Sequence, residues 1–254
     1  MRGTEKGTNA ASIPAARECP PLAFDHVSFA DGGRPVFEAL SFSLDAGELA
    51  CFTGSRCAGV KAFLRLASGN SRPASGEVRI CGLPAECWSP AELAQHARLV
   101  VPSARLFIGC TVSEMLEAHI EPESANTNNG KSLARLALAQ TGIAGAGNYY
   151  WSQLAPVERQ SVQLSLLLAR LWSLPESVRL VIVDDYLDAI PPQLAGLAFA
   201  ALHDFTRQRK ASVIATAHRV PLDEHPIDRV FLMHHDREFS CQAVNNEMPG
   251  QRVH

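Results

Sequence analysis

The segment with the clearest chemical potential runs from Gly54 to Ala62. It reads Gly54, Ser55, Arg56, Cys57, Ala58, Gly59, Val60, Lys61 and Ala62. The apolar stretch ELACFT precedes the segment and an apolar periodic stretch follows it, which predicts a strand, a turn and a helix. A glycine-rich turn at the start of a helix can cradle phosphate groups, because backbone N–H groups and the helix dipole converge on one point.

The full phosphate-binding pattern requires a lysine directly after its second glycine and then a serine or threonine. Val60 and Lys61 occupy these two places, and Ala62 follows them. Since one residue turns a helix by about 100°, we expect Lys61 to point away from phosphate groups held by the loop. An ordinary strand-to-helix turn therefore explains the segment about as well as a phosphate site does.

Two further groups of residues stand at predicted strand ends. Asp184 and Asp185 follow the apolar run LVIV, and His218 follows the run ASVIATA. An aspartate at a strand end can hold a magnesium-bound water, and its neighbour can act as a base. A helix N-cap or turn acid is the more ordinary role for a pair of aspartates. A hydrogen-bonded structural role is the more ordinary one for a single histidine.

The elements that would position these residues follow from hydrophobic periodicity. Two alternating stretches, 22–30 and 36–44, flank Asp31, Gly32 and Gly33, which predicts a hairpin. Another strand is expected at 75–82, and a polar loop is expected at 121–131. Helices are expected at 60–67, 90–96, 112–118, 133–140 and 158–172.

The last third of the chain alternates between strands and helices. The stretches 179–185, 211–218 and 228–235 read as buried strands, and 193–210 reads as a helix. Apolar strands separated by helices predict a parallel, doubly wound sheet, so the fold class is α/β. In such sheets ligands bind outside the carboxyl ends of the strands, where all three groups of candidate residues stand.

Composition excludes several classes of function. The chain has 254 residues and a formal net charge of −3, which leaves no basic surface for a nucleic acid partner. Its seven cysteines lack C-x-x-C spacing, so we expect reduced, mostly buried thiols in a cytosolic protein. We expect no secretory signal and no membrane span, so the protein would approach a membrane from its surface.

Taken together and in this order, the segments resemble the nucleotide-binding subunits of ATP-binding cassette (ABC) transporters, from about Leu22 to Met233. The stretches that carry the resemblance are LAFDHVSFADGGRPVFEALSFSLDAGELACFTG, SRPASGEVRICG, LVVPSARLFIGCTVSEML, LAPVERQSVQLSLLLARLW, RLVIVDDYLDAI and SVIATAH. Asp184 and His218 lie 34 positions apart, which suits the family's metal-binding aspartate and switch histidine.

The resemblance implies a P-loop NTPase-like parallel sheet core, an antiparallel β subdomain and an inserted helical subdomain at about 101–154. An ABC-type nucleotide-binding domain would span 22–245, between a flexible leader at 1–21 and a flexible tail at 246–254. ATP and Mg²⁺ are the implied ligands. The implied partners are an integral-membrane transporter subunit and a second ABC subunit in a homo- or heterodimer, on the cytoplasmic face of the membrane.

The resemblance also implies roles for single residues. The segment from Gly54 to Ala62 would contact the phosphates, and Asp184 would hold Mg²⁺ through water. Asp185 stands in the place of the family's catalytic glutamate and is one methylene shorter, and His218 stands in the place of the switch histidine. Asp31 stands where the family has an aromatic platform for adenine, and nearby Phe29 is the residue that could partly replace it.

Other places depart further from the family. Val60 replaces the P-loop lysine, which removes a charge-assisted contact worth about 1.5–3 kcal/mol. Lys61 replaces the magnesium-binding hydroxyl, and Ser103 replaces the glutamine that senses magnesium and the attacking water. Pro191 replaces the aspartate of the segment that crosses the dimer interface. The signature sequence, LSGGE in the family, reads Leu154, Ala155, Pro156, Val157 and Glu158 here.

These departures predict an ABC transporter ATP-binding subunit with weak or no ATP hydrolysis, because most groups that would position and stabilise the γ-phosphate are absent. The alternative is a non-hydrolysing scaffold or regulator of a membrane or ATPase complex, and a decayed product without function is a third reading. Docking in the family uses the region that corresponds to 103–117. Arg105, Leu106, Phe107 and Ile108 are therefore expected to contact a partner, unless Leu106 and Phe107 pack beneath the helical subdomain.

Overall fold

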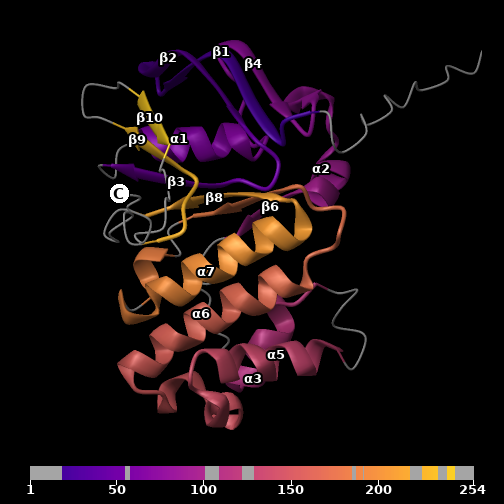
Figure 1. Ribbon diagram of the computed structural model, residues 1–254, viewed down its shortest axis with the longest axis vertical. Coiled ribbons are helices and arrows are strands. Elements are labelled where there is room, and N and C mark those ends of the chain that lie inside the picture. Colours follow the sequence, from indigo (N-terminus) through magenta and orange to yellow (C-terminus); the bar gives the residue numbers. More distant parts are fainter. Residues whose placement is uncertain are drawn as a thin grey trace, which may run out of the picture.

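Two β-sheets and a set of helices stack in layers along the long axis of the molecule (Figure 1). They belong to a computed structural model of the chain, which describes residues 19–54, 58–100, 109–121, 129–184, 187–190, 192–217, 225–233 and 239–243. Residues 1–18, most of the predicted leader, and the predicted tail at 246–254 lie outside this description. So do the following residues singled out in the sequence: Ser55, Arg56, Cys57, Ser103, Arg105, Leu106, Phe107, Ile108, Asp185, Pro191 and His218.

The first sheet is antiparallel and has the strand order β2-β1-β4-β5. Its strands are β1 (Leu22–Asp31), β2 (Arg34–Leu44), β4 (Ser75–Ile80) and β5 (Leu83–Pro84). The register pairs Leu22 with Leu44 and Asp31 with Arg34, which confirms the predicted hairpin. Gly32 and Gly33 form its turn at φ values of +58° and +79°, a backbone region that glycine enters without steric cost.

The second sheet has the order β10-β9-β3-β8-β7-β6, and all its neighbouring pairs are parallel except β9 with β10. Its strands are β3 (Leu49–Gly54), β6 (Ala97–Val100), β7 (Leu180–Val183), β8 (Ser212–Thr216), β9 (Arg229–Met233) and β10 (Phe239–Ala243). The predicted α/β class, with a parallel sheet core and an antiparallel β subdomain, is confirmed.

The sequence analysis missed strands β5, β6 and β10. β6 is a short edge strand in which Leu99 is 42% exposed, so it lacks the apolar run of a buried strand. β10 lies largely in the region from Ser240 onward, where the sequence shows no pattern. It is a strand because the edge of β9 offers it antiparallel partners from Phe239 to Ala243.

The helices match the predicted positions, with shifts at their starts. They are α1 (Ala58–Ala67), α2 (Pro90–His96), α3 (Val112–His119), α5 (Asn129–Gln140), α6 (Pro156–Ser173) and α7 (Pro192–Arg209). α5 begins at Asn129, inside the stretch predicted to be a polar loop. α6 begins two residues early, at Pro156, because the first helical position needs no N–H and suits proline. Short 3₁₀ turns occupy Ala85–Cys87, Ala144–Asn148, Trp151–Gln153 and Leu187–Ala189.

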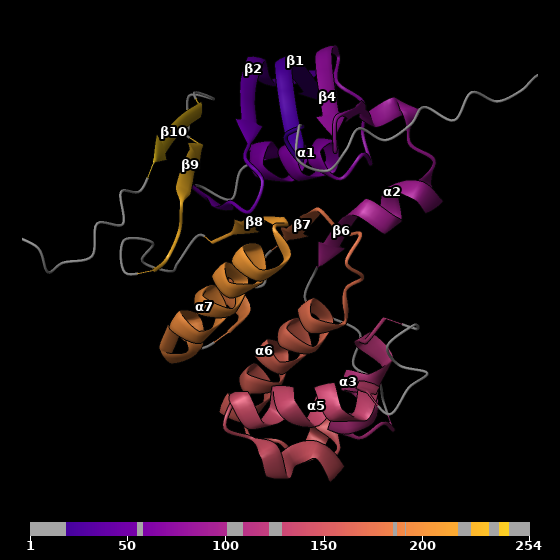
Figure 2. The ribbon, with the colours of Figure 1, turned by 45° about the vertical axis from the view of Figure 1, so that its right-hand side comes forward.

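The order of the layers shows where each face of the parallel sheet is buried (Figure 2). α1 lies between the two sheets, whereas α6 and α7 lie on the opposite face of the parallel sheet. Alternate residues of β3 divide accordingly: Ala50 and Phe52 belong to the core around α1, and Leu49 and Cys51 to the core around α6 and α7. α3 and α5 pack with α6 at the end of the molecule away from the antiparallel sheet.

Aromatic side chains fill the space between the two sheets. Phe63 of α1 is fully buried. Its ring centroid lies 4.1 Å from that of Phe52 in β3 and 5.1 Å from that of Phe24 in β1. Phe42 of β2 and Phe231 of β9 complete the cluster, with their ring centroids 5.2 Å apart. One residue of α1 therefore contacts both sheets.

A buried ion pair fixes the start of β3. Glu48 is 8% exposed, and its carboxylate accepts hydrogen bonds from Arg229 Nη2 at 2.6 Å and from the Asp45 N–H at 2.7 Å. Burial raises the pKa of Glu48 above its ordinary value, while these two hydrogen bonds act to lower it. Arg229 Nη1 also donates to the Ser43 carbonyl oxygen at 2.9 Å, so the pair joins β9 to the connection between β2 and β3.

We predict that Phe63→Ala lowers the free energy of unfolding by about 3–5 kcal/mol, because it removes a buried ring and leaves a cavity between the sheets. Urea denaturation followed by circular dichroism measures this change. Leu136→Ala, at a position that is 48% exposed, is the control and should change stability by less than about 0.5 kcal/mol. Equal losses in the two variants would contradict a central role for Phe63.

Candidate functional site

The candidate site is the carboxyl edge of the parallel sheet, where β3, β8 and β7 end side by side. Phe52 of β3 pairs with Thr216 of β8, and Ala215 of β8 pairs with Val183 of β7. Gly54, Thr216 and Asp184 therefore follow these pairs at one edge. This is the edge at which open parallel sheets bind ligands.

Asp184 is partly buried at this edge, and hydrogen bonds fix its position. Its main-chain N–H donates to the Val100 carbonyl oxygen at 2.9 Å, which anchors it beside the end of β6. Thr216 Oγ1 donates to Asp184 Oδ1 at 3.3 Å. A carboxylate held in this way can bind a water of a hydrated Mg²⁺ ion. The neighbouring candidates Asp185 and His218 lie outside the described residues.

Sequence reasoning did not single out Thr216. The signal for it was a polar residue at the last position of β8, directly after the buried apolar residues Val213, Ile214 and Ala215. A hydroxyl at the end of a fully buried strand needs a hydrogen-bond partner. Asp184 on the neighbouring strand provides that partner.

The described part of the phosphate-loop segment places its side chains unfavourably for anion binding. Gly54 ends β3 and α1 begins at Ala58, with Gly59 buried. Val60 is 3% exposed and Ala62 is fully buried, so both pack in the core between the sheets. Lys61 lies between them and is exposed. The side chain in the family's lysine place is therefore part of the core.

The region expected to hold adenine is also occupied by protein contacts. Phe29 is 8% exposed, and its ring stacks on that of Phe37 at a centroid distance of 6.0 Å. The Arg65 guanidinium lies 5.5 Å from the Phe29 centroid and pairs with Asp31 at 3.2 Å. An adenine could stack on Phe29 only after these neighbours moved.

The start of α6 carries the residues that correspond to the signature sequence. The carboxylate of Glu158 accepts a hydrogen bond from the Ala155 N–H at 2.7 Å. Pro156 has no N–H to offer, and Val157 is 66% exposed. An anion approaching this helix end would meet a carboxylate and an isopropyl group, with fewer free N–H donors than a helix start ordinarily supplies.

The described residues hold neither a metal cluster nor a membrane-spanning element. Within the described ranges, no group of three or more His, Cys, Asp and Glu side chains is arranged to hold a metal ion. In the same ranges, no helix is long and apolar enough to cross a bilayer.

The cysteines differ from the expectation of mostly buried thiols. The five whose side chains are described are free, but only Cys51 is buried, while Cys87 is exposed and Cys19, Cys81 and Cys110 are intermediate. The prediction was wrong because none of these four lies on the inward face of a strand. Burial raises the pKa of Cys81 to about 11, although Arg179 acts to lower it.

The fold matches that of the ATP-binding cassettes. Among solved structures, a nucleotide-free ATP-binding cassette from an ABC transporter superposes with a TM-score of 0.64 at 15% identity, covering 84% of this chain and 87% of that chain. cbiO1 from Clostridium perfringens, part of the ABC transporter complex cbiONQ, gives 0.63 at 17% identity, covering 85% of each chain.

Curated relatives point to the same class. The hemin import ATP-binding protein HmuV of Escherichia coli O157:H7 is 27% identical over 201 residues, which are 79% of this chain and 78% of that protein. HmuV of Methylobacillus flagellatus is 25% identical over 230 residues, 90% of this chain and 86% of that protein. No protein-family profile matches the sequence. The predicted resemblance is confirmed: the chain is an ABC transporter ATP-binding subunit-like protein.

We predict that iodoacetamide labels Cys87 at least about tenfold faster than Cys81 in the native protein at pH 8, because the thiolate is the reacting form and burial suppresses it at Cys81. The labelling of Cys81 should accelerate as the pH rises toward 11. Peptide mass spectrometry measures both rates. In urea, where burial is lost, the two cysteines should react alike, and equal rates in the native protein would refute the assignment.

Proposed function

We propose that the chain is the ATP-binding subunit of an ABC transporter and that it binds ATP weakly and hydrolyses it slowly or not at all. The observation that carries the proposal is the contrast at the sheet edge. Asp184 is held in place by Thr216 and by the main chain of β6, whereas Val60 in the lysine place is buried in the core. Compared with the ABC family, the chain would keep the fold and the aspartate at the sheet edge, and it would have fewer side chains that contact the phosphates.

The donor set at the edge fits a magnesium ion only in part. Mg²⁺ keeps several waters and binds proteins through one or two carboxylates together with substrate phosphates. Asp184 would be the protein ligand of such an ion through water. Lys61, in the place of the family's hydroxyl, supplies a positive charge in place of an oxygen ligand. The bound ion would add positive charge that holds the phosphates. The protein would contribute mainly by fixing the position of the ion through Asp184.

Hydrolysis requires groups that position water and stabilise charge at the γ-phosphate. Asp185 as base and His218 as switch residue belong to the proposal, together with the loop residues Ser55, Arg56 and Cys57. At the start of α6, Val157 and the capping carboxylate of Glu158 disfavour a γ-phosphate from a partner's nucleotide. In a homodimer both composite sites would carry these changes, and in a heterodimer each site would carry one changed half.

Partners and location follow from the proposed class. The chain would act at the cytoplasmic face of a membrane, with an integral-membrane transporter subunit and a second ABC subunit. The domain would span 22–245, with its helical subdomain at 101–154. The two HmuV relatives are named as hemin import ATP-binding proteins.

A groove beside the edge strand β6 offers a surface for the membrane subunit. It has a volume of about 230 Å³ and is lined by Trp88 and Leu93 on one side and by Leu99 on the edge strand β6. Leu99 is 42% exposed, and exposed apolar residues beside a groove are typical of interaction sites. The segment 103–117, where docking was predicted, follows directly after β6.

The second candidate function is a non-hydrolysing scaffold or regulator. It is favoured by three exposed apolar or aromatic side chains: Val157 at the start of α6, and Tyr149 and Tyr150 earlier in the chain, which are 49% and 47% exposed. A helix start that meets phosphate needs free N–H groups, whereas one that meets protein can carry apolar side chains. Loss of all nucleotide binding would leave this function as the better account.

Calorimetric titration with ATP, with and without Mg²⁺, tests the proposal. We expect magnesium-dependent binding that is about 10 to 100-fold weaker than a full phosphate loop gives, since one charge-assisted contact is missing. Asp184→Asn should weaken binding by about a further tenfold. Glu38→Gln, which alters an exposed acid on β2, is the control. Phosphate release at ordinary ABC rates by the pure protein would overturn the proposal of slow hydrolysis.

Leu99→Glu should reduce co-purification with the co-expressed membrane subunit of the same transporter by at least about tenfold, because it places a charge on the apolar groove. The double variant Arg105→Glu with Phe107→Ala tests the predicted docking segment in the same assay. Leu136→Glu, on the exposed face of α5, is the matched control. Undiminished co-purification of both docking variants, with unchanged melting temperatures, would exclude docking at this face.

A further inference from the structure

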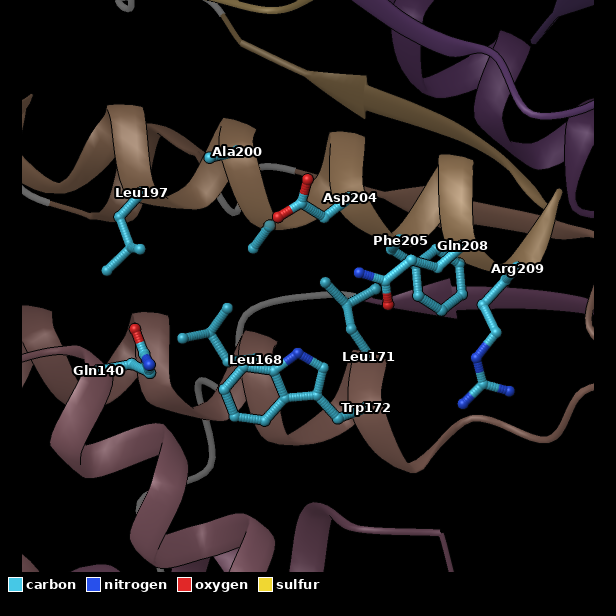
Figure 3. A pocket seen from close by; sticks show the side chains of 11 residues that line it. Gln140, Leu168, Leu171, Trp172, Leu197, Ala200, Asp204, Phe205, Gln208 and Arg209 are labelled. Carbon is cyan, nitrogen blue, oxygen red and sulfur yellow. The ribbon is translucent and has the colours of Figure 1, made fainter.

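A groove separates α6 from α7 on the side of the molecule opposite the antiparallel sheet (Figure 3). Its volume is about 400 Å³, which lies in the range of small-molecule sites. It is lined by Gln140 at the end of α5, by Leu168, Leu171 and Trp172 of α6, and by Leu197, Ala200, Ala201, Asp204, Phe205, Gln208 and Arg209 of α7.

The groove exists because one helix carries large side chains where the other carries small ones. α6 contributes Leu168, Leu171 and Trp172, and the facing positions of α7 include Ala200 and Ala201. Figure 3 shows Leu197 and Leu168 pointing toward each other across the groove. Leu168 and Leu171 are each 1% exposed, so they form an apolar floor that is closed below. The indole of Trp172 lies along the α6 side and is partly exposed.

Two opposite charges stand on the α7 side of the groove, above this apolar floor. Asp204 and Arg209 both come from α7, and their Cα atoms are about 7.5 Å apart along the helix axis, from five residues at 1.5 Å each. Within the part of the chain that the structure describes, neither side chain takes part in a hydrogen bond or an ion pair. By contrast, Arg207 in the same helix pairs with Asp228 at 2.9 Å.

The other polar groups of the groove can assist binding. Figure 3 shows the Gln208 carboxamide reaching over the groove toward Trp172, with the Gln140 carboxamide at the opposite end. Each carboxamide can donate and accept hydrogen bonds, and the Trp172 indole N–H can donate one. A charged ligand in the groove would therefore find neutral hydrogen-bonding groups between Asp204 and Arg209.

We propose that this groove binds a dipeptide-sized zwitterion with an apolar side chain. Its ammonium group pairs with the Asp204 carboxylate, and its carboxylate pairs with the Arg209 guanidinium, whose planar fork matches a carboxylate. The apolar side chain lies on Leu168, Leu197 and the Trp172 ring. The two charges belong to separate side chains, so an extended dipeptide, whose ammonium and carboxylate stand at opposite ends, suits them better than a single amino acid, which carries both groups on one carbon.

This site is separate from the sheet edge, so the proposal goes beyond the proposed ATP-linked function and does not depend on it. The groove lies where α6 and α7 face each other, and both helices also pack on the parallel sheet that ends at Asp184.

The last turn of α7 also benefits from a cation at Arg209, which complements the helix dipole. That benefit does not extend to Asp204, which lies more than one turn earlier.

The test is calorimetric titration of the full chain with leucyl-leucine, together with tryptophan fluorescence. We expect saturable binding, weakened at least about tenfold by Asp204→Asn and by Arg209→Gln. Glu38→Gln is the matched control and should leave binding unchanged. Trp172→Phe should remove the fluorescence response, since the other tryptophans, Trp88 and Trp151, do not line the groove.

Blocked ligands separate the charge contacts from apolar contact. N-acetyl-leucyl-leucinamide, which lacks both charges, should bind at least about tenfold more weakly than leucyl-leucine. Equal binding of the two ligands would overturn the proposal, as would the absence of saturation up to about 10 mM leucyl-leucine. Unchanged binding by both Asp204→Asn and Arg209→Gln, with melting temperatures equal to that of the original chain, would also overturn it. Titration in the presence of ATP distinguishes this site from the sheet edge, because ATP should not compete.

Discussion

The packing of α1 between the two sheets is the constraint on which the rest of the structure depends. Phe63 stacks on Phe52 of the parallel sheet and on Phe24 of the antiparallel sheet. One helix therefore fixes the position of the two sheets relative to each other. The start of α1 is also the candidate phosphate loop. Because Val60 and Ala62 are buried in the same core, the side chains available to a ligand at that helix start are fixed by the packing.

The carboxyl edge of the parallel sheet holds a hydrogen-bonded acid. Asp184 is held by a hydroxyl from β8 and by the main chain of β6, as a metal-binding acid requires. The start of α6 has the opposite character, since Glu158 caps its own helix and Val157 is exposed. Asp184 is therefore anchored by two neighbouring strands, whereas the start of α6 presents a carboxylate and an exposed apolar side chain.

Much of the fold was predictable from the residues alone, and the failures have identifiable causes. The hairpin at 22–44 and the helix at 90–96 carry periodic signals, the buried strands LVIV and SVIAT carry apolar runs, and the structure confirms all of them. β6 and β10 lack such signals, because strands at or near a sheet edge are defined by main-chain pairing with a neighbour. The cysteine expectation failed for a related reason, since residue type alone does not say which face of an element meets solvent.

The sequence by itself determined the class of the protein, because the order of loop, acid and helix segments is a local property of the chain. It also places Val60 and Lys61 where the phosphate-binding pattern has a lysine and a hydroxyl residue. Only the tertiary structure decided that Thr216 supports Asp184, that Phe29 is covered by Phe37 and Arg65, and that Asp204 and Arg209 share a groove with Trp172. These relations join residues far apart in the chain, or depend on how two helices face each other, and packing alone sets such distances.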